Sequence, residues 1–218
     1  MTTLKQHQEL ILTLICGICW SLAYIGIIVR SFRDKTYGMP FWALAFNICW
    51  EFIFAVIFVD KSYYAFMIIN RIWFSLDIFI LVAYCCYGRK EWPSQVNKKL
   101  FWPYSLLVLF ISYRFVYYLT IRIYEGGNEY VAFIQNLMMS LLFINMLNRR
   151  NSLAGQSAWI ALFKMVGSAA AAVILRHVPF LWSTGISTFM IDMIYFAMVL
   201  ARTPAAAPWI SRFQRLAR

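Results

Sequence analysis

The sequence predicts an all-α integral membrane protein, built as a bundle of seven transmembrane helices. Three observations lead to this prediction. Of the 218 residues, 62% are apolar and only 13% are charged, about half the charged fraction of a typical soluble domain. The apolar residues form blocks about as long as the roughly 20 residues that one spanning helix needs. Short polar strips separate these blocks, so the chain has room for seven spans and little else.

Each predicted span ends at residues that interrupt an apolar helix. The first block lacks the basic region and small-residue cleavage site of a signal peptide, so it is expected to remain as a helix. In chain order, the expected spans are 9–29, 39–59, 65–86, 103–122, 130–147, 156–176 and 181–201. The breaks between them are Ser31–Gly38, Asp60–Ser62, Gly88–Lys99 with Pro93, Glu125–Glu129 with two glycines, Asn148–Ser152, and His177–Phe180 with Pro179. These spans make up a transmembrane domain over residues 1–204.

The segment 205–218 is expected to form a basic amphipathic tail. Its apolar residues, among them Trp209 and Phe213, can face acyl chains, while Arg212, Arg215 and Arg218 recur every third residue. Such a segment can lie in the membrane interface with its cationic side toward the headgroups.

The distribution of Lys and Arg predicts the orientation of the chain. The first, third and fifth loops and the tail hold 3, 4, 2 and 4 basic residues, which makes 13. The N-terminus and the other three loops hold one each, which makes 4. Because basic loops stay in the cytoplasm, the N-terminus is expected outside and the C-terminus in the cytoplasm.

The net charge of +11 does not indicate a nucleic-acid-binding protein, because the basic residues lie at membrane edges and not on one phosphate-binding face. The sequence also lacks paired acidic motifs for magnesium and diphosphate, zinc-ligand spacing, and a phosphate-binding loop. No cofactor and no metal are therefore expected. The expected partners are the lipid bilayer and a small molecule, and the oligomeric state is not predicted.

Charged side chains within spans are costly, and they are usually either paired or functional. Glu51 has Asn47 one turn before it, and Asp192 shares its helix face with Thr188 and Tyr195. Neither carboxyl has a basic residue nearby in its own helix. Both are therefore expected to handle protons, and their side chains are expected to converge on one cavity lined by aromatic residues.

The other intramembrane charges have a structural interpretation. Asp77 has Arg71 within two turns, and Arg114 lies at similar depth in the next helix, so an ion pair with one of these arginines is expected. Lys164 lies in the cytoplasmic half of its helix, where its long side chain is able to reach the interface.

Aromatic residues make up 19% of the chain, and many lie in the middle of spans. Helix packing accounts for most of them, whereas the functional alternative is a cavity whose ring faces attract a cation. The residues expected to contact substrate or stabilise cations are Asn47, Trp50, Phe54, Trp73, Asp77, Arg114, Tyr117, Thr188 and Tyr195.

Three segments carry a resemblance to a known family. They are Asn47-Ile48-Cys49-Trp50-Glu51-Phe52, Ile191-Asp192-Met193-Ile194-Tyr195 and Arg71-Ile72-Trp73-Phe74-Ser75-Leu76-Asp77. With the length and the seven spans, they resemble the small integral-membrane terpene cyclases of fungal meroterpenoid and indole-diterpene pathways, which have bacterial relatives in indole-sesquiterpenoid pathways. The resemblance covers nearly the whole chain in layout and is motif-specific at these segments.

The resemblance implies that Glu51 and Asp192 are the catalytic acids. It implies cyclisation of a prenyl chain attached to an aromatic, indole or peptide-like core, started by protonation of a terminal epoxide or alkene. The alternative is a small proton-coupled transporter or a seven-helix receptor, in which the same carboxyls act as a relay or as counter-ions. Transporters often show inverted repeats and broken helices at matching positions, and neither is visible in this sequence.

Overall fold

The computed structural model describes residues 2–58, 64–123 and 128–203, and all regular structure in these ranges is helical. The α-helices are α1 (Thr2–Asp34), α2 (Phe41–Phe52), α3 (Tyr64–Tyr87), α4 (Phe101–Tyr118), α5 (Asn128–Arg150), α6 (Ala158–Ile174) and α7 (Pro179–Ala201). Short π-helical turns continue two of them, η1 (Ile53–Ile57) after α2 and η4 (Leu119–Ile123) after α4, and the 3-10 turns η2 (Gly88–Glu91) and η3 (Lys98–Leu100) lie between α3 and α4. The expected tail, 205–218, lies outside the described residues.

These helices confirm the predicted all-α membrane bundle. Five of them are long and apolar enough to cross a bilayer. Two shorter apolar helices, Phe41–Ile57 and Ala158–Ile174, complete the bundle. Seventeen residues of helix extend about 25 Å, which is slightly less than the roughly 30 Å hydrocarbon core of a bilayer.

The ends of the helices follow local chemistry. α1 continues five residues beyond the expected end at residue 29, because Arg30 pairs with Asp34 one turn later at 2.8 Å and holds the charged turn helical. Pro40 precedes the first residue of α2, and Pro179 is the first residue of α7. Proline suits these positions because the first turn of a helix needs no amide donor.

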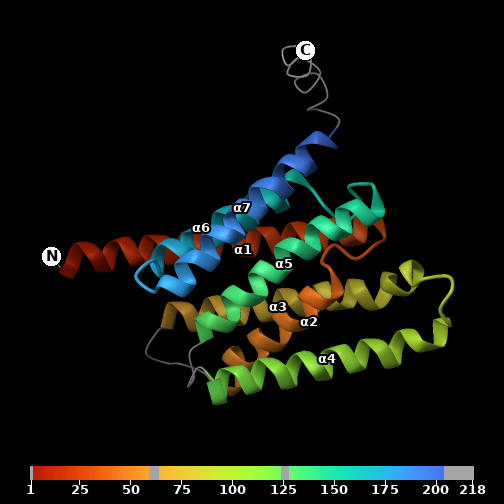
Figure 1. Ribbon diagram of the computed structural model, residues 1–218, viewed down its shortest axis with the longest axis horizontal. Helices are drawn as coiled ribbons and strands as arrows, with labels where there is room; N and C mark the ends of the chain where they lie inside the picture. The colour runs from red at the N-terminus through yellow and green to blue at the C-terminus, as the bar shows by residue number, and fades with distance from the viewer. Residues whose placement is uncertain (1, 59–63, 124–127, 204–218) are drawn as a thin grey trace, which may run out of the picture.

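The bundle has two halves that share α1 and α5. α1 packs against α6 on one side and α3 on the other, and α6 and α5 both pack against α7 (Figure 1). In the other half, α2 contacts α3, α4 and α5. α2 is therefore enclosed by three helices, and most of its residues from Phe41 to Glu51 are buried.

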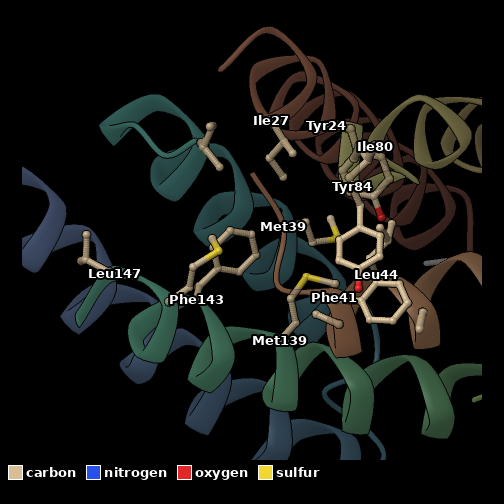
Figure 2. Packing of buried hydrophobic residues seen from close by; sticks show 14 of the residues in the cluster. Tyr24, Ile27, Met39, Phe41, Leu44, Ile80, Tyr84, Met139, Phe143 and Leu147 are labelled. Atoms are coloured by element: carbon tan, nitrogen blue, oxygen red, sulfur yellow. The ribbon is translucent and has the colours of Figure 1, made fainter. Parts of the chain in front are cut away.

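The largest cluster of buried apolar side chains lies where these halves meet. Figure 2 shows side chains from α1, α2, α3 and α5 interlocking there, with Tyr84 near Phe41 and Phe143 beside Met139. The rings of Phe41 and Tyr84 are stacked, with centroids 3.9 Å apart. This packing fixes the start of α2 against α3 and so sets the position of the polar residues further along α2.

The three basic loops meet at one end of the bundle. Arg150, at the end of α5, donates to both oxygens of Glu91 in η2, at 2.9 and 3.0 Å. The Asp34 carboxylate accepts from the backbone amide of Gly155, which joins the first loop to the loop between α5 and α6. These loops therefore lie at one end of the bundle, as the two helices between each loop and the next require.

Candidate active site

Glu51 is the centre of a buried polar cluster formed by α1, α2 and α3. The Tyr24 hydroxyl donates to Glu51 Oε1 at 2.9 Å. The Asn47 amide nitrogen lies 2.9 Å from the same oxygen and 2.8 Å from Oδ2 of Asp77. Gln135 of α5 donates to the Asn47 carbonyl at 3.3 Å. We call Tyr24, Asn47, Glu51 and Asp77 the Glu51 cluster. Tyr24 and Asn47 bond to the Glu51 carboxyl, and Asn47 links it to Asp77.

The sequence places Glu51 and Asn47 together because residues four apart lie on one helix face. Two residues after Glu51 the helix widens into the π-turn η1, where the amide of Ile53 lies within bonding distance of the carbonyls of both Cys49 and Trp50. Single π-turns inside helices are frequent at functional sites. The carboxyl thus lies where α2 changes its helical period.

The Glu51 cluster holds two carboxyls and, within the described part of the chain, no cation. Glu51 and Asp77 are 1% and 0% exposed. One oxygen of each, Oε2 and Oδ1, is buried without a hydrogen-bond partner among the described residues. The expected ion pair of Asp77 with Arg71 or Arg114 is wrong, because both arginines are exposed on the outside of the bundle while Asp77 faces Asn47.

Asp192 lies in a second cluster with a different character. The Lys164 ammonium of α6 donates to both of its oxygens, at 2.8 and 3.0 Å, and to the Ser140 hydroxyl of α5 at 2.6 Å. Lys164 is 1% exposed, so the expectation that it reaches the interface is wrong. We call Ser140, Lys164 and Asp192 the Asp192 cluster; it is a buried ion pair with one hydroxyl ligand.

The hydroxyl groups expected to orient Asp192 bond elsewhere. Thr188 donates to the backbone carbonyl of Thr184 at 2.9 Å, as hydroxyls inside helices commonly do. Tyr195 donates to Gln156 Oε1 at 2.8 Å. Both side chains are fully buried, yet it is a lysine from the neighbouring helix that holds the carboxylate.

The carboxyls of Glu51 and Asp192 belong to separate hydrogen-bonded clusters, and their convergence on one cavity stays a prediction. Within the described residues, Glu51 and Asp192 share no hydrogen-bond partner. Two rings of α1 connect the clusters. The rings of Trp20 and Tyr24 pack edge to face with their centroids 5.6 Å apart, and the Lys164 ammonium lies 5.6 Å from the centroid of the Trp20 ring.

The other residues expected to contact substrate lie in different surroundings. Trp50 and Phe54 pack against each other at 5.2 Å, in a buried group against which Tyr117 also packs. Trp73, in the core, donates its indole N–H to Ser21 at 3.2 Å. Arg114 lies on the exposed surface. Trp50 and Phe54 therefore lie within three residues of Glu51 in the chain, and Tyr117 of α4 belongs to the same packed group.

A cavity of about 740 Å³ lies at the end of the bundle that carries the basic loops. We call it the aromatic cavity, since its lining includes Phe41, Trp42, Tyr84, Trp92, Phe101 and Tyr104. Trp42 donates to the Tyr104 hydroxyl at 2.8 Å, and the Trp92 and Tyr104 rings are 5.2 Å apart. The indole N–H of Trp92 has no acceptor within the described structure.

Sequence reasoning did not identify Tyr24, Gln135 or Ser140, and it gave Lys164 a different role. A tyrosine in the middle of an otherwise apolar span is a usable signal, because a buried phenol usually finds a partner. Lys164 and Asp192 carry opposite charges on consecutive spans, which also points to a pair. In the described ranges, no group of three or more His, Cys, Asp or Glu residues is arranged to hold a metal ion.

Comparison with known proteins identifies the class. The family model for Pyr4-like transmembrane terpene cyclases matches residues 4–203, nearly the whole chain, and the protein belongs to this family. The chain is 32% identical over 169 residues to the Pyr4-family terpene cyclase mfmH of Annulohypoxylon moriforme, covering 74% of this chain and 67% of that protein.

Two further relatives match over most of their length. The terpene cyclase pyr4 of Aspergillus fumigatus is 25% identical over 196 residues, which cover 82% of this chain and 80% of the relative. The asnovolin H synthase nvfL of Aspergillus novofumigatus is 29% identical over 174 residues, with 77% and 70% covered. Family membership favours a membrane-bound terpene cyclase over the transporter and receptor alternatives.

Proposed function

We propose that this protein cyclises a prenyl chain attached to an aromatic or indole-type core, and that Glu51 donates the proton that starts the reaction. The observation that carries the assignment is the environment of Glu51, which is buried against Tyr24, Asn47 and Asp77 with no cation within the described residues. A buried carboxyl that has a second carboxyl nearby and no cation is suited to the role of a proton donor.

Asp192 is suited to a different task. Its two oxygens both accept from the Lys164 ammonium, so the carboxyl is already engaged as one half of a buried ion pair. Protonating it, or taking a proton from it, would disturb a buried pair. We therefore assign Asp192 and Lys164 to shaping the site and its electric field, and we assign proton delivery to Glu51, with Asp77 as the carboxyl that shares its proton.

The proposed reaction is balanced and redox-neutral. The Glu51 proton adds to the terminal epoxide oxygen or to the terminal alkene carbon, and the next double bond of the chain attacks the electron-poor carbon. In the epoxide case this attack breaks the C–O bond, and the epoxide oxygen leaves the step as a hydroxyl group on the product. Each ring closure moves the positive charge one double bond further along. Loss of a proton from carbon to a base then restores a double bond, so the product is an isomer of the substrate. Rings such as Trp50 and Phe54 stabilise the passing charge through their faces.

We place the core of the substrate in the aromatic cavity. Phe41 lines that cavity, and Glu51 lies ten residues further along α2, which is about 15 Å of helix. A prenyl chain lying along α2 would extend from the cavity toward the acid. Flat aromatic walls with a few polar groups suit a flat aromatic or indole core.

The test is a panel of prenylated aromatic and indole substrates, supplied as alkenes and as epoxides to membranes that contain the protein. We expect products of unchanged mass from the wild type. Glu51→Gln retains shape but has no transferable proton, so turnover per folded protein should fall by at least about 10²–10⁴-fold. Asp77→Asn should reduce turnover and shift its pH profile, because the shared proton then has one carboxyl instead of two.

Asp192→Asn is the matched comparison, since it also turns a buried carboxyl into an amide. It should lower stability as well as turnover, because it leaves the Lys164 ammonium without its counter-charge. Near-wild-type turnover in Glu51→Gln would refute Glu51 as the acid. No isomer from any substrate, with the protein folded, would refute the proposed function.

A further inference from the structure

A second cavity, of about 650 Å³, lies apart from both carboxyl clusters at the end of the bundle with the basic loops. The end of α1, the loop between α5 and α6, and the end of α7 form it. Its lining includes Arg30 and Arg202 with several hydroxyl and amide groups, and no acidic residue. We call it the interface cavity.

The charge of the interface cavity is positive. Arg30 is largely neutralised by Asp34 at 2.8 Å, but its Nε has no acceptor within the described residues. Among the described residues, the hydrogen bonds that Arg202 donates are long, 3.3 Å to the Asn148 side chain and 3.4 Å to the Met198 carbonyl. No ion pair of Arg202 occurs within the described part of the chain, so its charge is available to an anion.

Two further groups of the cavity suit an anion. Gln156 is fully buried, and its Oε1 accepts from Tyr195, which leaves its Nε2–H₂ group without an acceptor in the described structure. α6 begins at Ala158, with Ser157 as its cap, so the positive end of the helix dipole also lies at the cavity. A phosphate group is the ligand that unpaired N–H donors, a guanidinium and a helix N-terminus bind together.

The position of Trp159 indicates which kind of molecule carries that phosphate group. Its side chain lines the cavity and is 66% exposed, with its ring stacked on Phe163 at 5.8 Å. Exposed tryptophan at the end of a span is typical of the boundary between headgroups and acyl chains. A lipid whose phosphate occupies the cavity would lay its glycerol and acyl chains along this ring.

We propose that the interface cavity binds the phosphate of an anionic membrane phospholipid. The basic loops predict that this end of the bundle faces the cytoplasmic leaflet, where anionic lipids are concentrated. The proposal is independent of the cyclase chemistry, because none of the cavity's donors belongs to the Glu51 or Asp192 cluster. The bound lipid would tie the ends of α1, α6 and α7 together.

Thermal unfolding of the full chain in nanodiscs tests the proposal. Phosphatidylglycerol added to phosphatidylcholine should raise Tm of the wild type by roughly 2–4 °C, the change expected for a modest stabilisation of a chain this long. Arg202→Gln should lose most of that shift, and Arg202→Lys should retain part of it. Arg33→Gln is the control, because this arginine is 65% exposed at the same end of the bundle but does not line the cavity.

Native mass spectrometry gives a second readout, since phosphatidylglycerol should stay bound to the wild type and to Arg33→Gln but not to Arg202→Gln. Inorganic phosphate in phosphatidylcholine nanodiscs should leave Tm unchanged. Equal shifts in Arg202→Gln and Arg33→Gln would overturn the proposal, and so would the absence of any phosphatidylglycerol effect. If inorganic phosphate reproduced the shift, the ligand would be a soluble anion and the lipid assignment would be wrong.

Discussion

Replacing Lys164 with methionine removes the ammonium group that holds Asp192 and leaves an apolar stem of similar length. Both carboxylate oxygens then lose their donor, at 2.8 and 3.0 Å, in a site that is 0% exposed. Breaking a buried pair from one side typically costs about 3–5 kcal/mol. At 2–4 °C per kcal/mol for a chain of this size, Tm should fall by about 6–20 °C.

The double variant Lys164→Met/Asp192→Leu removes both charges and gives the matched control. Replacing a whole buried pair with apolar residues of similar volume is often neutral or stabilising. The double variant should therefore recover most of the Tm lost by Lys164→Met, although turnover should remain low if Asp192 shapes the active site. Unfolding in detergent, followed by intrinsic tryptophan fluorescence, measures the first quantity, and product formation per folded protein measures the second.

Two results would refute this reasoning. If Lys164→Met unfolded within a degree or two of the wild type, the pair would contribute little and Asp192 would not depend on its cation. If instead Lys164→Met raised turnover per folded protein, then a protonated Asp192 would be the productive form. The acid would in that case be Asp192, and Glu51 would have the supporting role.

Two other predictions concern the whole chain. The 13-to-4 asymmetry of basic residues predicts an N-terminus outside and a C-terminus in the cytoplasm. A C-terminal fusion to alkaline phosphatase should therefore be inactive, and a C-terminal fusion to a fluorescent protein should be bright. The opposite pattern would contradict this orientation. Proton delivery from a carboxyl needs no metal, so turnover should survive EDTA; loss of activity that magnesium restores would count against Glu51 as the sole initiator.

The bundle itself was largely predictable from one sequence. Apolar blocks of spanning length and the breaks between them predicted the helices, because a bilayer leaves few other ways to satisfy the backbone. The spacing of Asn47 and Glu51 also correctly placed two members of one cluster on one helix face. Helix ends were less predictable, since the pairing of Arg30 with Asp34 turns an apparent loop into the last turn of α1.

Partners between helices were not predictable in the same way. Asp77 was expected to pair with Arg71, within two turns of it, or with Arg114, at similar depth. Neither criterion tells which face of a helix points into the bundle, and both arginines are exposed. Lys164 and Asp192 are 28 residues apart, and only the packing of α6 on α7 brings them together. Tyr24 was missed because no charged residue lies within one turn of it in α1 to direct attention to it.

The pair between Lys164 and Asp192 also bears on how the chain enters the membrane during synthesis. A lysine or an aspartate at the centre of an isolated helix costs about 2.5–3.5 kcal/mol during insertion through the translocon. α6 is only 17 residues long and α7 follows after four residues, so the two can leave the translocon together with their charges already neutralised. α6 is then a helix whose stable insertion depends on the next segment to be translated, and Ser140 in the preceding helix offers the ammonium a hydroxyl until that segment arrives.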